Sequence, residues 1–414
     1  MIHRHLTPAV LAALKDTPVV LLQGARQTGK STLARWIAAG PHRARYLTLD
    51  DPGILASVQA DPTGFLAQGD GPLVLDEVQR APGLFLPLKA LVDRHRAPGR
   101  FLLTGSANVL TAPRIADSLA GRMQALTLRP FSQGEIEGRK EGFLVAAMGG
   151  DPMRNGTAMP DVSDIHRRML AGGYPEPRAR PAAARRQAWH TAYVRTLLQR
   201  DVRDLSAVEG LASFPRLLGI LATRSGLPLG ASDISRDLGM PYSTLRRYLA
   251  LLEATFLIHL LPAWSPNRGQ QFVKAPKLIL GDTGVMSSLL GASPERLPAD
   301  AGLRGRLLET FVILELMKQA DWMDDPPAMH HFRTHTGDEV DLVVEEASGR
   351  VTGFEIKHAA TLNGADFKGL RRLQAEARRR FHRGILLYLG KDILPFGDGL
   401  SAVPLPTVWG RITA

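Results

Sequence analysis

The segment that most restricts the fold of this chain is a glycine-containing loop close to the N-terminus. An apolar stretch, Val19-Val20-Leu21-Leu22, is followed by Gly24-Ala25-Arg26-Gln27-Thr28-Gly29-Lys30-Ser31. The octapeptide has P-loop spacing, in which glycines allow successive backbone N–H groups to turn toward phosphate oxygens. A helix that begins at the loop adds the positive end of its dipole to the anion site. A chance match is a poor explanation, because the apolar strand that the mechanism requires precedes the loop.

The side chains of this loop have separate expected roles. Lys30 is expected to reach the β- and γ-phosphates, and the Ser31 hydroxyl is expected to ligate Mg²⁺. The residues expected to contact the nucleotide are Gly24, Ala25, Arg26, Gln27, Thr28, Gly29, Lys30, Ser31 and Thr32. The sequence therefore predicts a site for a nucleoside triphosphate and magnesium.

A second apolar strand ends in two acidic residues. Leu73-Val74-Leu75 is followed by Asp76 and Glu77. At this place in P-loop proteins, the first carboxylate orients magnesium and the second polarises the attacking water. The alternative is an ordinary N-cap in a loop. The adjacent acids, together with the lack of a guanine-reading Asn-Lys-x-Asp motif in the sequence, favour ATP over GTP.

The remaining strands of this region complete the prediction of an α/β fold. Arg45-Tyr46-Leu47-Thr48-Leu49 and Phe101-Leu102-Leu103-Thr104 are also expected strands, and helical segments separate the four. This alternation predicts a parallel sheet with helices on both faces. A polar residue after the last strand can sense the γ-phosphate. Ser106 is the first candidate for this role and Asn108 the second, although either could equally be the N-cap of the next helix.

These segments resemble the AAA+ superfamily. The residues that carry the resemblance are Gln23-Gly24-Ala25-Arg26-Gln27-Thr28-Gly29-Lys30, Leu75-Asp76-Glu77-Val78-Gln79, Leu103-Thr104-Gly105-Ser106 and Ser118-Leu119-Ala120-Gly121-Arg122. A narrower resemblance is to a prokaryotic group of AAA+ ATPases that carries a C-terminal domain of unassigned function. It rests on Gly172-Gly173-Tyr174-Pro175-Glu176, Arg200-Asp201-Val202-Arg203-Asp204-Leu205 and Lys277-Leu278-Ile279-Leu280-Gly281-Asp282-Thr283-Gly284, and it covers nearly the whole chain.

The resemblance implies a ring of identical subunits in which an arginine of one subunit completes the neighbour's ATP site. Such a finger stabilises charge in the transition state. Arg122 is the first candidate, because it follows the sensor strand by one helix, and Arg200 and Arg203 are weaker ones. The alternative for Arg122 is a surface salt bridge.

A helix-turn-helix pattern lies farther along the chain. Its first helix ends at Gly239, which suits a left-handed C-cap, and Ser243 can cap the second, which repeats leucines at 245, 249 and 252. Segments 256–261 and 277–280 are then the two wing strands of a winged helix. The outward residues expected to contact DNA are Arg236, Tyr242, Ser243, Thr244, Arg246 and Arg247. A module for packing or protein contact is the alternative.

The C-terminal region contains acidic residues at positions typical of a restriction-endonuclease-like fold. Glu309 lies in an expected helix and Asp341 in an expected strand, and Glu355 and Lys357 share one face of the next strand. In this Asp…Glu-x-Lys arrangement, Glu309, Asp341 and Glu355 would hold Mg²⁺, and Lys357 would position or activate water. The next residues, His358-Ala359-Ala360, supply no further polar ligand, so the fold does not by itself imply cleavage.

Segment composition divides the chain into five parts. They are a P-loop AAA+ core at 1–141, a flexible linker rich in helix breakers at 142–164, a helical lid at 165–222, a winged helix at 223–290 and a nuclease-like α/β domain at 300–414. His330 and His331 have no third ligand at a suitable spacing, so no zinc site is expected.

Overall composition agrees with a cytoplasmic, multidomain protein. The 414 residues are 44% apolar and 22% charged, which permits two to four domains with cores of ordinary size. A net charge of +11 favours DNA as a partner, although an arginine-rich coding bias would produce the same surplus. There are no cysteines, which excludes disulfides and thiolate sites. No apolar run approaches a membrane-spanning length, and no secretion signal is recognised at the N-terminus, so no membrane partner is expected.

These features together predict an ATP- and magnesium-dependent AAA+ ATPase that acts on DNA through the winged helix and the nuclease-like domain. Branched or recombining DNA is one candidate substrate. Two alternatives stay open at this point. The protein could be a nucleotide switch whose winged helix and degenerate nuclease fold recruit another protein, or a metal-dependent nuclease gated by ATP.

Overall fold

The computed structural model describes most of the chain and divides it into two compact units. The described residues are 2–69, 71–106, 119–149, 161–197, 213–271 and 274–410, without the side chains of Arg268 and Gln270. One unit consists of His3–Phe131 with Ala254–Phe256, and the other of Ser132–Glu253 with Leu257–Ala414. The expected roles of Asn108, Arg200 and Arg203 fall on residues outside the described ranges, as do Ser118 and the rest of the segment 200–205.

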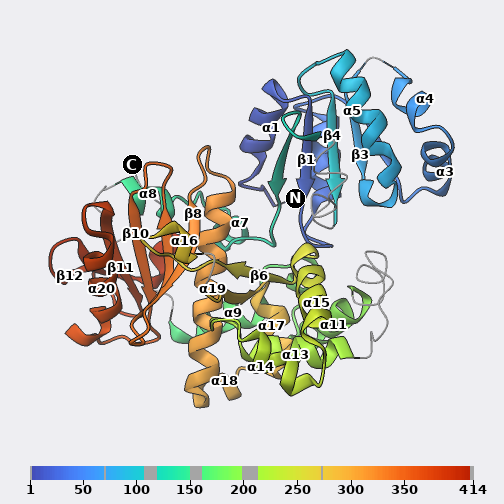
Figure 1. Cartoon of the computed structure of the whole chain (residues 1–414). Helices are drawn as coiled ribbons and strands as arrows, with labels where there is room; N and C mark the ends of the chain where they lie inside the picture. The colour runs from blue at the N-terminus through green and yellow to red at the C-terminus, as the bar shows by residue number, and fades with distance from the viewer. Residues whose placement is uncertain are drawn as a thin grey trace. The chain divides into compact units, whose positions relative to one another are not determined.

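A five-stranded parallel sheet forms the centre of the first unit, as the sequence predicted (Figure 1). Its spatial order is β2-β3-β4-β1-β5, and every pair of neighbours is parallel. The strands are β1 (Val19–Gln23), β2 (Arg45–Thr48), β3 (Leu73–Asp76), β4 (Phe101–Gly105) and β5 (Met123–Thr127). The fifth strand was not anticipated, because it lies at an edge and its residues are only partly covered, which leaves no continuous apolar run.

Helices cover this sheet and supply its core. They are α1 (Thr7–Asp16), α2 (Lys30–Ala39), α3 (Pro52–Ala60), α4 (Pro62–Ala67) and α5 (Phe85–Arg94), with short 3₁₀ turns at Val78–Arg80 and Pro82–Leu84. Leu88 and Val92 of α5 pack with Leu21, Leu75 and Leu103 of the three central strands. All residues of β1 and β4 are buried, which agrees with the apolar residues that begin both strands.

The first half of the second unit is mainly helical. Its helices are α7 (Gln133–Glu137), α8 (Phe143–Gly149), α9 (Val162–Ala171), α10 (Pro175–Arg178), α11 (Ala183–Leu197), α13 (Phe214–Thr223), α14 (Ala231–Leu238), α15 (Tyr242–Ala254), α16 (Arg268–Gln271), α17 (Thr283–Leu290) and α18 (Arg296–Ala299). Two antiparallel strands, β6 (Ile258–Leu261) and β7 (Lys277–Leu280), follow α15 and flank α16.

A mixed six-stranded sheet forms the C-terminal half of the second unit. Its order is β12-β13-β11-β10-β9-β8. Strand β9 is antiparallel to both β8 and β10, β11 is parallel to both β10 and β13, and β12 is antiparallel to β13. The strands are β8 (Ala328–Arg333), β9 (Glu339–Glu345), β10 (Val351–Ile356), β11 (Phe381–Tyr388), β12 (Leu394–Pro395) and β13 (Leu400–Pro404). Figure 1 shows helices α19 (Ala301–Asp321) and α20 (Lys368–Ala377) on opposite faces of this sheet. The restriction-endonuclease-like assignment of this half stays a prediction.

Helix α20 packs on the sheet where β10 carries a glycine. Leu370 and Leu373 of α20 belong to one apolar cluster with Val340, Val343 and Leu386. A Cβ added at Gly353 of β10 would lie 2.7 Å from a methyl carbon of Leu373. A side chain at this position would therefore displace the leucine side chains of α20 from the sheet.

Residues 142–164 differ from the expected flexible linker. Helix α8 lies inside this segment and buries Phe143, Leu144, Ala147 and Met148, whose spacing places them on one helix face. Helix α9 begins at the other end of the segment, and residues 150–160 lie outside the described part of the chain. The division between the two units falls after Phe131, earlier than the expected boundary at 141, and the expected lid helices belong to the second unit.

Membrane insertion finds no support in the described part of the chain, where no helix combines enough length and apolar character to cross a bilayer.

Candidate functional site

The backbone of the P-loop requires glycine at two positions. Gly24 has φ of 148°, and a Cβ added there would lie 2.3 Å from the carbonyl oxygen of Leu128. Gly29 has φ of 97° and is the N-cap of helix α2, whose first residue is Lys30. Side chains other than hydrogen are strained in such conformations. The loop thus ends at a helix N-terminus, the place where a helix attracts anions.

Lys30 folds back across its own loop. Its side chain is buried, and Nζ donates hydrogen bonds of 2.8 Å to the carbonyl oxygen of Gly24 and 2.7 Å to that of Ala25. The Thr28 hydroxyl donates to the same Ala25 carbonyl at 3.0 Å, and Arg4 donates to the Thr28 carbonyl at 2.7 Å. The ammonium group therefore lies at the centre of the loop, where it can meet a phosphate.

Asp76 accepts hydrogen bonds from three hydroxyl groups. Ser31 donates to Oδ1 at 3.0 Å, Tyr46 donates to Oδ2 at 2.7 Å, and Thr104 also donates to Oδ1. Asp76 is the last residue of β3, and Tyr46 and Thr104 come from the neighbouring strands β2 and β4. The structure thus brings together Ser31 and Asp76, the two expected magnesium ligands, and adds two partners that the sequence did not reveal.

Glu77 and Ser106 are linked through a third residue. The side-chain nitrogen of Gln79 donates to the Ser106 hydroxyl at 2.8 Å and to a carboxylate oxygen of Glu77. The backbone N–H of Glu77 donates to the Thr104 hydroxyl at 3.1 Å. The carboxylate expected to polarise water is therefore held beside the residue expected to sense the γ-phosphate.

Backbone strain gathers at the same site. Four non-glycine residues of the described chain have positive φ, and two of them are Gln27 at 62° and Glu77 at 63°. A non-glycine residue in the left-handed region costs about 1–3 kcal/mol and persists only where the surroundings enforce it. Such positions concentrate at functional sites, which agrees with the roles expected for the loop and for Glu77.

Tyr46 connects this site to helix α2. Burial, and next the hydrogen bond to Asp76, raise the pKa of Tyr46 to about 12. The guanidinium carbon of Arg35 lies 5.0 Å from the centre of the Tyr46 ring, and the hydrogen bond between these two side chains raises the pKa of Arg35. Tyr46 is therefore a neutral hydrogen-bond donor to Asp76 throughout the physiological pH range.

The residues of the loop fit a nucleoside triphosphate with magnesium. A Cβ would fill the cradle at Gly24, a buried ammonium group lies across the loop, and a hydroxyl–carboxylate pair offers the oxygen ligands that Mg²⁺ prefers. Lys30 and the loop would hold the phosphates, and Ser31 and Asp76 would hold magnesium, which supplies Lewis-acid polarisation of a phosphoryl oxygen when bound. Of the other loop residues, Ala25 and Thr28 are buried, whereas Gln27 and Thr32 are exposed.

Arg122 forms the surface ion pair that was the alternative to a finger role. Its Nη2 lies 3.1 Å from Oδ2 of Asp93 on α5, and its Nε contacts the other carboxylate oxygen. The hydrogen bond from Arg122 lowers the pKa of Asp93. Action as a finger would require release of Asp93, and it stays a prediction.

The helix-turn-helix segment has the geometry expected of its apolar residues. Ile234 of α14 and Leu245, Leu249 and Leu252 of α15 are buried, and Gly239 ends α14 in the left-handed region with φ of 61°. Helix α15 already begins at Tyr242, so Ser243 lies inside its first turn and is not the expected cap. Of the outward residues, Thr244 is partly covered and the others are exposed, namely Arg236, Tyr242, Ser243, Arg246 and Arg247.

The acidic residues of the C-terminal half lie near one another. Asp341 comes from β9, Glu355 from β10 and Glu309 from α19. Lys357 places its Nζ 2.9 Å from Oε1 of Glu355, which agrees with the expected common face. The Asp341 carboxylate accepts the backbone N–H of Ile356 at 2.9 Å.

A second lysine, which the sequence did not reveal, enters this cluster. Lys277 begins β7, and its buried Nζ lies 2.6 Å from Oε1 of Glu309 and 3.4 Å from Oδ1 of Asp341. Among the described residues, no group of three or more His, Cys, Asp or Glu side chains is placed to hold a metal ion. The Lys277 ammonium group thus lies against two of the three carboxylates that were expected to hold magnesium, Glu309 and Asp341, and the magnesium role of the set stays a prediction.

Burial governs the protonation of this cluster. Burial, and next the charge of Asp341, raise the pKa of Glu309 and of Glu355 to about 8 each. Burial alone would lower the pKa of Lys277, but the charges of Glu309 and Asp341 raise it above its ordinary value. Lys277 is therefore a permanent positive charge inside the cluster.

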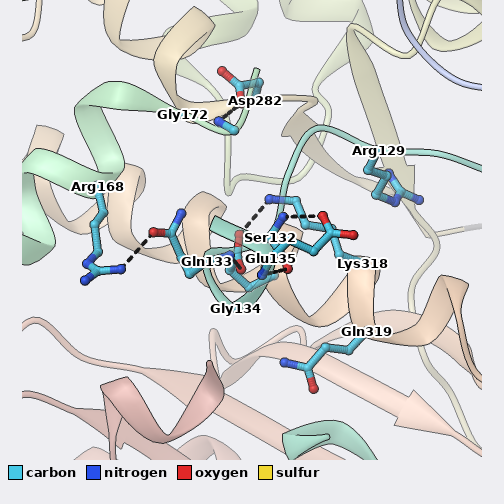
Figure 2. Close-up of polar contacts among 12 residues, drawn as sticks. Arg129, Ser132, Gln133, Gly134, Glu135, Arg168, Gly172, Asp282, Lys318 and Gln319 are labelled. Atoms are coloured by element: carbon cyan, nitrogen blue, oxygen red, sulfur yellow. Dashed lines mark hydrogen bonds and ion pairs between the residues drawn. The ribbon is translucent and has the colours of Figure 1, made fainter. Parts of the chain in front are cut away.

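Figure 2 shows a buried polar network at the first residues of the second unit. The Gln133 N–H donates at 2.8 Å to the fully buried carboxylate of Glu315, which also pairs with Lys318 at 2.6 Å. Gln319 accepts the Leu144 N–H at 2.9 Å, and Arg168 donates to the Gln133 side chain at 3.1 Å. Burial raises the pKa of Glu315 to about 7. Helix α19 thus fixes the segment that leaves the ATPase unit.

Family models match three consecutive parts of the chain. An AAA domain matches residues 16–137, a domain of unknown function (DUF8612) matches 162–296, and a second domain of unknown function (DUF4143) matches 304–408. With the parallel sheet and the P-loop, the first match defines the N-terminal unit as an AAA+ P-loop ATPase domain.

Two mycobacterial proteins are similar to this chain over nearly its whole length. The uncharacterized proteins Rv2008c of Mycobacterium tuberculosis and Mb2031c of Mycobacterium bovis are each 31% identical to this chain over 393 residues, which cover 95% of it and 81% of the relative. The chain belongs to the same family as these proteins, a prokaryotic AAA+ family in which the ATPase domain is followed by a C-terminal domain of unassigned function.

Solved structures add only a distant likeness. The Holliday junction branch migration motor RuvB of Thermotoga maritima, and a variant of it, are 19% identical over 62% of this chain and 87% of the motor, with a TM-score of 0.28. A score this low establishes neither a shared arrangement nor a shared function.

Proposed function

We propose that this protein is a cytoplasmic ATPase that hydrolyses ATP with magnesium, assembles into a ring of identical subunits and acts on DNA, including branched DNA. The second unit binds the DNA through helix α15. Nucleotide hydrolysis is then the motor or timer of a reaction whose substrate is nucleic acid.

The ATPase part of the proposal is supported by the hydroxyl groups that donate hydrogen bonds to the Asp76 carboxylate. The Ser31 hydroxyl at 3.0 Å and the Tyr46 hydroxyl at 2.7 Å orient the two carboxylate oxygens separately. Glu77 follows directly, so that its carboxylate can accept a proton from an attacking water while Lys30 holds the phosphates. The observation that carries the ATPase assignment is the set of three hydroxyl groups that donate to Asp76 directly before Glu77.

The DNA part is supported by the exposed side chains at the beginning of α15. Tyr242 and Arg246, and likewise Ser243 and Arg247, are four residues apart and share one face of the helix. The leucines of α15 are buried on its other side, so this face is available to a partner. Arginine, tyrosine and serine are donors to phosphate and base edges, and a helix presented in this way enters the major groove.

Binding of duplex and four-way-junction DNA, measured by fluorescence anisotropy across a salt series, tests this proposal. The logarithm of the affinity should fall linearly with the logarithm of the salt concentration, with a slope of about −0.9 for each phosphate contacted. An Arg246→Ala/Arg247→Ala variant should bind more weakly and lose about 2 from the magnitude of that slope.

A charge-matched variant separates local contact from general attraction. Arg43 and Arg94 are exposed in the first unit, and replacement of both by Ala removes the same charge without touching α15. The salt slope of this control should match the wild type. If the wild type binds no DNA even at low salt, the protein is instead a nucleotide switch whose second unit recruits another protein.

A further inference from the structure

We propose that the ammonium group of Lys277 occupies the cation position of the acidic cluster formed by Glu309, Asp341 and Glu355. The cluster is then a permanent buried ion-pair link between strand β7 and the elements α19 and β9, which we call the interlock. It is not a metal-dependent nuclease centre. Neither ATP hydrolysis nor DNA binding is required for this role.

The path of the backbone fixes Lys277 in this position. Lys277 is paired with Leu261 of β6 and forms a further bridge to Pro228, so its Cα is held from both sides. From there the side chain reaches the carboxylate of Glu309 on α19 and both the carboxylate and the carbonyl oxygen of Asp341 on β9, the last at 3.2 Å. With 3% of its side chain exposed, the ammonium group is bound by protein rather than by water.

Glu309 is enclosed on its other side as well. A Cβ added at Gly226 would lie 2.8 Å from Oε2 of Glu309, and Gly226 has φ of 85°. The backbone therefore approaches one carboxylate oxygen while Lys277 contacts the other.

The carboxylate oxygens of this cluster face ammonium groups and a backbone N–H, whereas those of Asp76 face only neutral hydroxyl groups. An ammonium group repels a divalent cation, and Mg²⁺ needs near-octahedral oxygen ligands at about 2.0–2.1 Å. Oε1 of Glu309 and Oδ1 of Asp341 face Lys277, Oδ2 of Asp341 accepts the Ile356 N–H, and Oε1 of Glu355 pairs with Lys357. Oε2 of Glu355 is buried without a hydrogen-bond partner in the described part of the chain, and a single oxygen does not make a magnesium site.

Metal binding by the full-length protein, measured without nucleotide or DNA, tests the inference directly. Wild type and an Asp341→Asn variant are titrated with Mn²⁺ and monitored by electron paramagnetic resonance, with Glu355→Gln as a second variant. All three should bind the same amount of Mn²⁺, because neither residue is a ligand. One additional Mn²⁺ ion in the wild type, or cleavage of supercoiled DNA that Asp341→Asn abolishes, would overturn the inference.

Thermal unfolding tests the interlock. Lys277→Met removes the cation that pairs with two buried acidic side chains and should lower Tm by about 10 °C. Adding Glu309→Gln should recover part of this loss, since the double variant removes both members of the pair. The control Lys274→Met removes a lysine that donates to the carbonyl oxygen of Arg333 and should leave Tm within about 2 °C of wild type. An unchanged Tm in Lys277→Met would contradict the interlock, and if this variant does not fold, the Mn²⁺ titration of the wild type still decides.

The two proposals fail in different ways. Loss of DNA binding in the arginine variants of α15 leaves the metal titration unaffected. A metal site that depends on Asp341 would remove the interlock and would leave the ATPase and the α15 contact in place.

Discussion

The side-chain nitrogen of Gln79 lies 2.8 Å from the hydroxyl oxygen of Ser106 and also contacts the carboxylate of Glu77. Gln79 therefore joins the residue that would polarise water to the residue that would sense the γ-phosphate. A displacement of Glu77 or of Ser106 would therefore affect the other residue through the Gln79 side chain.

Gln79→Ala should slow ATP hydrolysis without weakening ATP binding. The hydrogen bond to a charged carboxylate contributes about 1.5–3 kcal/mol, so kcat should fall about tenfold or more while the affinity for ATP changes less than about twofold. Steady-state kinetics and equilibrium nucleotide binding separate the two quantities. Gln68→Ala, a change at an exposed position in the same unit, serves as the control. An unchanged kcat in Gln79→Ala would mean that Glu77 is positioned by other groups.

Substitutions at Lys30 and Glu77 should affect different steps. Lys30→Ala should abolish nucleotide binding, because the ammonium group lies at the centre of the loop. Glu77→Gln should still bind ATP but turn it over at least about a hundredfold more slowly, as expected for loss of a general base. Filter binding with labelled ATP, followed by analysis of the bound nucleotide, distinguishes trapped ATP from ADP. Normal turnover in Glu77→Gln would exclude Glu77 as the base.

Removing the Tyr46 hydroxyl should change how stability depends on alkaline pH. Because the folded protein raises the pKa of Tyr46 to about 12, its stabilising contribution is complete below the ordinary value of 10 and is lost as pH rises through 12. The free energy of unfolding of the wild type should thus fall more steeply from about pH 9 to about pH 11.5 than that of Tyr46→Phe. Urea midpoints at several pH values provide the measurement, and parallel curves would contradict the expectation.

Loss of the buried carboxylate of Glu315 should destabilise the second unit strongly. Glu315→Ala removes the buried acceptor of the Gln133 N–H and one ion-pair partner of Lys318, at a cost of about 3–5 kcal/mol. Glu376→Ala removes an exposed i,i+4 partner of Arg372 and should cost about 0.5 kcal/mol or less. Urea unfolding compares the two variants. Similar losses in both would show that Glu315 contributes no more than a surface pair.

The first unit was predictable because its signals are local. A P-loop, the acids after a buried strand and the alternation of apolar strands with helices each lie within a few residues, and the structure has the parallel sheet that they predicted. Thr104 is a polar residue at the end of a buried strand and could have been recognised beside Asp76 by the same rule. Gln79 stands in a motif that was noted, but only the turn after β3 shows where its side chain points.

The second unit was less predictable because its decisive contacts are long-range. The pairing of Lys277 with Glu309 spans 32 residues and that with Asp341 spans 64. In the sequence, Lys277 is an ordinary first residue of an apolar strand, and no periodicity relates it to an acid on a later helix. The sequence pattern indicated the three carboxylates. It gave no sign that Lys277, from a different strand, would lie against two of them.

The role of Arg122 can be decided by mixing two inactive variants. If Arg122 completes the site of a neighbouring subunit, Lys30→Ala and Arg122→Ala are each inactive alone. In random 1:1 rings, about a quarter of the interfaces join an intact P-loop to an intact arginine, so about a quarter of the wild-type rate should return. Wild-type turnover in Arg122→Ala alone, or no recovery in rings shown to contain both variants, would exclude the finger.

Asp93→Ala separates the finger from the ion pair that the structure shows. This change frees Arg122 from its partner on α5 and leaves the arginine in place. If the ion pair is the whole role of Arg122, Asp93→Ala and Arg122→Ala should have the same effect on ATP turnover. If Arg122 acts on a neighbour, only Arg122→Ala should lose turnover, because release of the ion pair makes the arginine more available to the transition state.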